Sequence, residues 1–256
     1  ISLHMCGIIA CLCVNQASCA QILFTGLKYM QNRGYDSAGL FSVSKIVSES
    51  GDKTISRNTT KYASTDSKTA LECLEDTLTT HTTSKVGFGH TRWATHGAKT
   101  DLNSHPHTSS DDLFTIVHNG IIENYKELQK MLLDEGYTFK SETDTEIVCN
   151  LLSYVYWQHC QELSTNDKSV VQQIAQIIGK TQEMMSGSGG LVIHYKHLPE
   201  TLFCVRHGSP LLIGKTDREI IVASEQAGFG NRLNTYFILK SNDVCVLNYD
   251  SDGNEL

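Results

Sequence analysis

The stretch "CGIIACLCV", residues 6 to 14, is a continuous apolar run with the length of one buried β-strand. In the segment "QASCAQILFTGLKYM" that follows it, four apolar residues recur at helical spacing, namely Ala20, Leu23, Leu27 and Met30. The chain is therefore predicted to begin with a strand that leads into a helix.

The same stretch begins with a cysteine directly after a methionine. Ile1 is not a translational start, so we expect Met5 to be the natural start and residues 1–4 to derive from cloning. The alternative is a short natural propeptide that is removed autocatalytically. Once Met5 is removed, Cys6 carries both a thiol and a free α-amino group, which together can act as nucleophile and base.

The middle of the chain predicts strands mixed with helices. Strands are expected at 39–44, 85–93 and 113–120, with one more inside the polar stretch 48–68. Helices are expected at about 68–79, 144–160 and 168–185, the last ended by "SGSGG" at 186–190. Another helix is expected to begin at a capping box of Asn124 and Glu127 and to stop at Gly136.

The last part of the chain predicts only strands. Their expected positions are 191–195, 201–206, 210–214, 219–224, 235–240 and 243–249, arranged as a meander. Because strands and helices do not alternate regularly, the sequence indicates an α+β fold and not a doubly wound parallel sheet.

The composition excludes several classes of partner. The chain has 256 residues, 40% of them hydrophobic and 19% charged, with a formal net charge of −7. Without a basic run, a nucleic-acid partner is not expected. No apolar stretch is long enough to span a membrane, and no signal peptide precedes the first strand. Nine cysteines, an odd number mostly in apolar surroundings, indicate a reducing compartment, which we take to be the cytoplasm.

Four short stretches concentrate reactive and rigid residue types. They are "RGYDSAG" at 33–39, "HTRWATHG" at 90–97, "VHNGIIENY" at 117–125 and "SETDTE" at 141–146. Each alone is typical of a turn or a helix start. Together, and in this order, they are far more specific.

With "CGII" and "NSHPH", these motifs resemble the class II, N-terminal-nucleophile glutamine amidotransferase domain of glucosamine-6-phosphate synthase, also called glutamine–fructose-6-phosphate aminotransferase. The resemblance runs from Cys6 to about residue 250 and includes "RHGSPLLIG" and "VASEQ". Glu225 stands where the family commonly has aspartate, and "GAKT" replaces a proline-containing turn after Gly97. The resemblance implies a four-layer αββα sandwich of two sheets between helices.

The resemblance also implies site residues. Cys6 would be the nucleophile, and Asn119 and Gly120 would bind the oxyanion. Arg92 would bind the α-carboxylate of glutamine and Asp144 its α-amino group, because a guanidinium matches a carboxylate and an anion matches an ammonium. Further residues implied around the substrate are Trp93, Thr95, His96 and Arg33.

The implied activity is the hydrolysis of L-glutamine to glutamate and ammonia, with no cofactor. In the family, sugar-isomerase domains of the same polypeptide use the ammonia to convert fructose 6-phosphate into glucosamine 6-phosphate. This sequence lacks those domains, through which a homo-oligomer would form. The expected organisation is one amidotransferase domain over 6–250, followed by the start of a linker at 251–256.

Other functions stay open at this point. Five of the eleven histidines, His90, His96, His105, His107 and His118, suggest a metal site, although their spacing matches no helical zinc motif. The chain could also be a catalytically silent module that senses glutamine, or the glutaminase domain of another class II amidotransferase. Hydrolysis of bound glutamine would separate an active glutaminase from the silent module.

Overall fold

A computed structural model describes residues 6–14, 18–31, 35–47, 53–93, 97–163 and 169–248. Three of the expected site residues, Arg33, Thr95 and His96, lie outside the described residues. The same holds for residues 1–5 and the expected linker at 251–256.

The described elements do not alternate regularly, which confirms the α+β class. The helices are α1 (Ala20–Tyr29), α2 (Ala70–Thr77), α3 (Tyr125–Asp134), α4 (Asp144–Leu163) and α5 (Val170–Met184), with 3-10 helices η2 (Leu78–His81) and η3 (Gln226–Phe229). The strands are β1 (Gly7–Cys13), β2 (Ser37–Val47), β3 (Lys53–Ala63), β4 (Val86–Arg92), β5 (His107–Thr108), β6 (Phe114–Ile122), β7 (Gly187–Tyr195), β8 (Thr201–His207), β9 (Leu212–Lys215), β10 (Glu219–Ala223), β11 (Phe237–Ile238) and β12 (Val244–Asn248). None of these helices is both long and apolar enough to cross a membrane.

The described strands form two antiparallel sheets. The first sheet has the order β11-β9-β10-β1-β4-β2-β3, and the second has the order β12-β8-β7-β6-β5. Strand β1 lies inside the first sheet, where it pairs with β4 on one side and β10 on the other. Its backbone hydrogen-bonding groups are therefore satisfied on both edges.

Strand β1 is also buried on both faces, which explains its continuous apolar run. One face packs toward the second sheet and carries Ile8, Ala10 and Leu12. The opposite face packs against α1 and α2 through Ile9 and Cys11. Because side chains alternate across a strand, a strand in a central layer needs apolar residues at every position.

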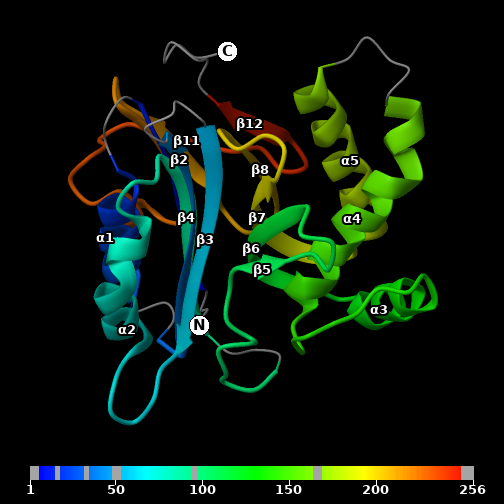
Figure 1. Ribbon diagram of the computed structural model, residues 1–256, viewed down its shortest axis with the longest axis horizontal. Coiled ribbons are helices and arrows are strands. Elements are labelled where there is room, and N and C mark those ends of the chain that lie inside the picture. The colour runs from blue at the N-terminus through cyan, green and yellow to red at the C-terminus, as the bar shows by residue number, and fades with distance from the viewer. Residues whose placement is uncertain are drawn as a thin grey trace.

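The second sheet is covered by α3, α4 and α5. Phe114 and Ile116 of β6 pack into the same core as Ile147 and Leu151 of α4 and Ile177 of α5. The layers therefore run from α1 and α2, through the first and second sheets, to α3, α4 and α5 (Figure 1). This confirms the expected four-layer αββα sandwich.

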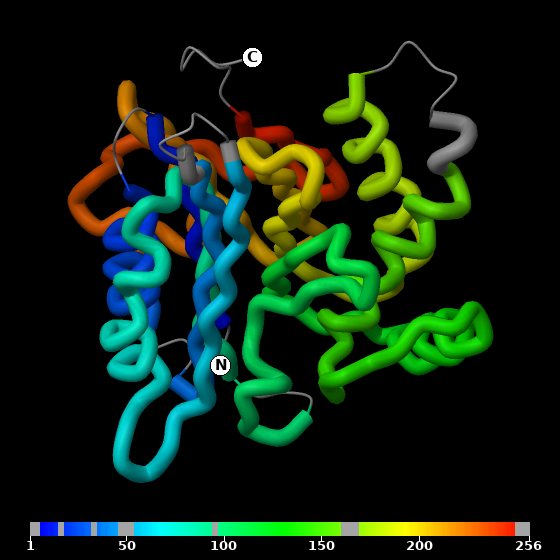
Figure 2. The backbone as a smooth tube through the Cα atoms, viewed as in Figure 1, coloured from blue at the N-terminus to red at the C-terminus, as the bar shows by residue number. Residues whose placement is uncertain are grey.

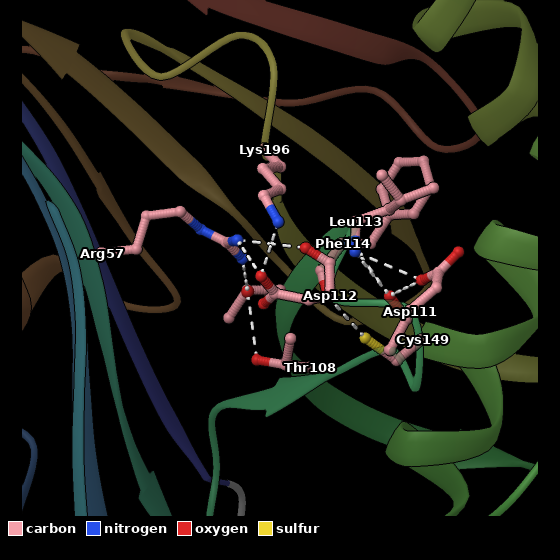
Figure 3. A network of polar contacts seen from close by, with 10 residues as sticks. Arg57, Thr108, Asp111, Asp112, Leu113, Phe114, Cys149 and Lys196 are labelled. Carbon is pink, nitrogen blue, oxygen red and sulfur yellow. Dashed lines mark hydrogen bonds and ion pairs between the residues drawn. The ribbon is translucent and has the colours of Figure 1, made fainter. Parts of the chain in front are cut away.

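At one end of β6, an ionic network joins the two sheets (Figure 3). The guanidinium of Arg57 on β3 donates to the Asp112 carboxylate at 2.9 Å and to the Thr115 hydroxyl at 3.0 Å. Lys196, in the turn after β7, also donates to the Asp112 carboxylate at 2.9 Å. These contacts hold the start of β6 against the first sheet.

The segment between β4 and β5 runs beside β3 (Figure 2). The ammonium of Lys61 on β3 donates to the backbone carbonyl oxygens of Leu102, Ser104 and Pro106 at 2.7–3.3 Å. Gly39 of β2 permits the close approach of this segment, because a Cβ there would lie 2.1 Å from the His105 carbonyl oxygen. The sequence thereby places His105 between the two sheets.

The expected meander of the last strands is wrong. Strands β7, β8 and β12 belong to the second sheet, whereas β9, β10 and β11 belong to the first. The chain crosses between sheets after β8 and returns before β12. The expected break at 186–190 does end α5, but most of "SGSGG" then begins strand β7.

The expected capping box at α3 is also wrong, although the helix itself is confirmed. Asn124 makes no side-chain capping bond. Its amide donates instead to the Met184 carbonyl oxygen and accepts from the Ser186 N–H, both at 2.9 Å. The side chain therefore ties the start of α3 to the end of α5. Gly136, with a φ of +86°, follows the helix as expected.

Candidate active site

The candidate site lies where elements of both sheets end close together. Cys6 immediately precedes β1, and Arg92 ends the neighbouring antiparallel strand β4. Gly120 lies on β6 of the second sheet, and Asp144 is the first residue of α4. A pocket is lined by these residues and others, namely Cys6, Arg92, Trp93, His105, His118, Gly120, Thr143, Asp144 and Thr145.

The Cys6 thiol is held by the backbone of Trp93. The Trp93 N–H donates to Sγ at 3.2 Å, and the thiol lies 3.7 Å from the Trp93 carbonyl oxygen. Burial raises the pKa of the Cys6 thiol above its ordinary value, and the Trp93 N–H and the Arg92 charge oppose that shift only in part. The thiol therefore needs a base to become a nucleophile at neutral pH.

Asn119 and Gly120 border the pocket from β6. The Asn119 side-chain amide donates to the Cys6 carbonyl oxygen, which places its NH₂ group beside the cysteine. A Cβ on Gly120 would lie 1.9 Å from the Ser188 carbonyl oxygen and 2.5 Å from the Gly189 Cα. Only glycine therefore fits at position 120 without a backbone shift.

Arg92 and Asp144 supply opposite charges to the same pocket. Both are buried, with 4% and 7% of their surfaces exposed. Burial lowers the pKa of Arg92, while the nearby Cys6, Asp36 and Asp144 raise it. One Asp144 carboxylate oxygen accepts from the Ile122 N–H at 2.9 Å, which fixes the carboxylate relative to β6.

Four histidines form a cluster at the pocket, which we define as His90, His105, His107 and His118; His105 and His118 line the pocket. The rings of His90 and His105 stack with centroids 4.1 Å apart, and His105 meets His107 edge-on at 4.9 Å. Burial lowers the pKa of His90 to about 3 and also lowers the pKa of the other three. The cluster is therefore uncharged at neutral pH.

The arrangement of this cluster tests the possibility, raised by the sequence, that the histidines form a metal site. Four of the five histidines do lie together, while His96 lies outside the described residues. Across the described part of the chain, however, no three His, Cys, Asp or Glu side chains are arranged to hold a metal ion. His90, His105 and His107 contact one another through ring faces and edges, and His118 meets His90 and His105 through its backbone.

The structure thus brings together six of the nine expected site residues: Cys6, Arg92, Trp93, Asn119, Gly120 and Asp144. It adds Thr143 and Thr145, which line the pocket but were not singled out in "SETDTE". It also adds His90, which contacts Asn119. Thr143, Thr145 and His90 all lie in the motifs quoted from the sequence, and this was the sequence evidence that could have pointed to them. Which side chains of a motif face the pocket depends on the packing.

Comparison with solved structures defines the class of fold. The chain matches the glutamine phosphoribosylpyrophosphate amidotransferase of B. subtilis with a TM-score of 0.69 and 20% sequence identity, over 96% of this chain and 48% of the other. The fold is therefore that of the N-terminal-nucleophile amidotransferases.

Sequence comparison then identifies the family. Residues 53–166 match the model of the glutamine amidotransferase domain. The chain is 34% identical over 251 residues to a probable glutamine–fructose-6-phosphate aminotransferase (isomerizing) of Acanthamoeba polyphaga mimivirus, covering 97% of this chain and 37% of the relative. It is 35% identical over 247 residues to the enzyme of that name from Clostridium perfringens, covering 96% and 36%. The chain belongs to the glutamine amidotransferase domain family and spans little more than a third of these relatives.

Proposed function

We propose that this chain hydrolyses the side-chain amide of L-glutamine to give glutamate and ammonia, with Cys6 as the nucleophile. The observation that carries the proposal is the position of the Cys6 thiol. It lies in one pocket with an amide NH₂ group from Asn119, a glycine on β6, and the opposite charges of Arg92 and Asp144. These are the groups that amide hydrolysis of a zwitterionic amino acid requires.

The nucleophile is activated by its own backbone nitrogen. A free α-amino group has a pKa of about 7.7–8.0, so part of it is unprotonated at neutral pH. It is carried by the same residue and can accept the thiol proton, although burial raises the pKa of the Cys6 thiol. The thiolate then attacks the amide carbon of glutamine. The C–N bond breaks, the proton passes to the leaving nitrogen, and ammonia departs from a thioester. Water adds to the thioester and releases glutamate and the free thiol.

The oxyanion formed in both steps is bound from β6. The Asn119 NH₂ group has two donor hydrogens, of which one bonds the Cys6 carbonyl oxygen and the other is directed to the oxyanion. The Gly120 N–H is the second donor. Loss of one such donor typically costs about 2.7–4 kcal/mol of transition-state stabilisation.

Glutamine is recognised through its two charged groups. Arg92 binds the α-carboxylate and Asp144 the α-amino group. We assign Trp93, Thr95, His96 and Arg33 to the surroundings of the bound substrate, on the basis of the sequence motifs in which they occur.

The names of the relatives indicate the use of the ammonia. We propose that it passes to sugar-isomerase domains that aminate fructose 6-phosphate, and that the assembled protein is a cytoplasmic homo-oligomer formed through those domains. The proposed domain comprises residues 6–250, with residues 251–256 at the start of the linker.

The first test is glutamine hydrolysis by protein that begins at Met5, with removal of Met5 verified by mass. Cys6→Ala is expected to abolish ammonia release and to retain glutamine binding. Cys73→Ala, at another half-buried cysteine, is the matched control and is expected to keep full activity. Substantial ammonia release by Cys6→Ala would refute the proposal.

The second test concerns the base. The chain with Ile1–Met5 still attached has an amide nitrogen at Cys6, which cannot accept a proton. Its rate of hydrolysis is expected to be lower by at least 10²–10⁴-fold, the usual contribution of a general base. Equal rates in the two forms, with the extension intact by mass, would show that another group is the base.

A further inference from the structure

The orientation of the Asn119 amide decides whether the pocket is lined by a donor or by an acceptor. A primary amide can be rotated by 180° about its last bond with almost no change of shape. With the NH₂ group toward Cys6, Asn119 can stabilise an oxyanion. With the oxygen toward Cys6, it would repel one. Something must therefore hold the amide in one of the two orientations.

The neighbour on the opposite side of the amide is His90 of β4. Its Nε2 atom lies 3.1 Å from the backbone carbonyl oxygen of His118 and 2.9 Å from the Asn119 side chain. A backbone carbonyl can only accept a hydrogen bond, so Nε2 must carry the proton. The Asn119 atom beside it must then be the oxygen Oδ1, and the NH₂ group must face Cys6.

The tautomer of His90 is fixed by the same contacts. The ring is buried, with 1% of its surface exposed, and burial lowers its pKa to about 3. A neutral imidazole has one N–H, which is used at Nε2. The other nitrogen, Nδ1, is buried and has no hydrogen-bond partner among the described residues. No described group beside Nδ1 therefore favours placing the proton on that nitrogen.

The ring of His90 is also held in place from behind. His105 stacks on it, and His107 packs against His105 and lies with Nε2 3.0 Å from the Thr143 hydroxyl. Lys61 binds the backbone on both sides of His105. The position of the His90 donor is therefore set by both sheets and by the segment before α4.

We propose that His90 is a positioning residue that sets the orientation of the Asn119 amide and thereby creates the side-chain half of the oxyanion site. The inference rests on the proposed function, in which Asn119 binds the oxyanion. His90 does not touch the substrate and acts only through Asn119.

The test compares two replacements of His90 by steady-state kinetics. His90→Leu removes the donor and is expected to lower kcat about 10- to 100-fold with KM within about twofold, because only the transition state carries the oxyanion. His90→Gln can place an amide N–H near the position of Nε2 and is expected to recover most of the lost kcat. A variant His90→Leu with wild-type kcat would overturn the inference.

A matched control separates positioning from packing. His194 on β7 is another buried histidine in the layer between the sheets, packed against Phe41 at a centroid distance of 5.0 Å. His194→Leu removes a ring of the same size from the same layer and is expected to leave kcat unchanged. An equal fall in kcat for both leucine variants would mean that the effect at His90 is one of packing.

A double-mutant cycle shows whether His90 acts through Asn119. Asn119→Ala is expected to lower kcat about 10²–10³-fold. If His90 acts through Asn119, adding His90→Leu to Asn119→Ala is expected to change kcat by no more than about twofold. Additive effects would overturn the inference. If Cys6→Ala remains active, the proposed function fails instead.

The tautomer supplies a test that does not depend on activity. Nitrogen NMR of ¹⁵N-histidine-labelled protein, assigned with His90→Gln, is expected to show a neutral His90 ring with the proton on Nε2. A proton on Nδ1 would remove the donor from Asn119 and overturn the inference.

Discussion

Strand β6 is tied to the first sheet at both of its ends, and the two ties differ in kind. At its start, Thr115 is bound by Arg57, whose partner Asp112 is 56% exposed at the side chain. Near its end, Asn119 is bound by His90, which is neutral and 1% exposed. The first end holds the sheets together with charges that water partly screens. The second end holds one amide in one orientation.

The difference shows which end of β6 fixes the positions of side-chain atoms more strictly. A half-exposed ion pair tolerates small shifts, because its energy varies slowly with distance and is weakened by solvent. A buried, uncharged hydrogen bond specifies which atom faces which, because a misplaced donor would be left unsatisfied. The candidate active site lies at the end of β6 that is fixed by neutral groups.

The largest expected contrast is in catalysis. Asn119→Ala is expected to lower kcat about 10²–10³-fold. Thr115→Val on the same face of β6 is expected to leave kcat unchanged, because the Thr115 hydroxyl bonds Arg57 and Thr108, which lie away from the pocket. Steady-state ammonia release from glutamine measures both. If Thr115→Val also lowered kcat more than about tenfold, the two ends would not be functionally separate.

A smaller contrast is expected in the response of stability to acid. Burial lowers the pKa of His81 to about 4 and those of His90 and His194 to about 3. Between pH 6.5 and these values the unfolded chain binds protons that the folded chain does not. The free energy of unfolding should therefore fall as the pH falls, by about 1.4 kcal/mol per pH unit for each such histidine.

Urea unfolding between pH 7 and pH 5 measures this dependence. His194→Leu is expected to reduce the slope of the free energy of unfolding against pH by the contribution of one histidine, about 1.4 kcal/mol per pH unit. The ion pairs of Asp112 at the start of β6 respond in a different pH range. Lys196 and Arg57 outweigh the effect of burial and lower the pKa of Asp112 below its ordinary value. Its contribution is lost only in more acidic solution. A free energy of unfolding that stayed constant from pH 7 to pH 5 would contradict the lowered pKa values of these buried histidines.

The smallest expected effect is on the free energy of unfolding, when Lys196 is removed from the ion pairs at the start of β6. Lys196→Ala is expected to lower the free energy of unfolding by no more than about 1 kcal/mol, and by less in 1 M salt, because both partners are largely solvated. Arg57→Ala is expected to cost more, about 1–3 kcal/mol, because its 13%-exposed side chain also bonds Thr115. Equal losses in the two variants would show that the Thr115 contact contributes nothing.

Much of the fold was predictable from local patterns. The continuous apolar run of β1 and the helical spacing after Ser18 identified the first two elements, because both patterns report burial along a single segment. The division of the last strands between two sheets was not predictable. The pattern of a strand shows which faces are buried and does not show which strand lies beside it.

The candidate site likewise contains residues that could be predicted from the sequence and residues that could not. The sequence motifs predicted Cys6, Arg92 and Asp144 from the residue types that the chemistry needs, and the structure places all three in one pocket. The role of His90 required the structure. A histidine in the sequence equally suggests a metal ligand, and only the position of its Nε2 atom between two acceptors shows that it is a donor. The failed capping box at Asn124 has a similar cause, since distant partners on α5 and beyond displaced the local one.

The placement of β1 has a consequence for how activity is lost on heating. This strand is paired on both edges and buried on both faces, so its amide hydrogens should exchange with solvent only when the whole domain unfolds. Cys6 is attached directly to it. We therefore expect the proposed nucleophile to be attached to a slowly exchanging strand and to keep its place while loops and helix ends open and close around it.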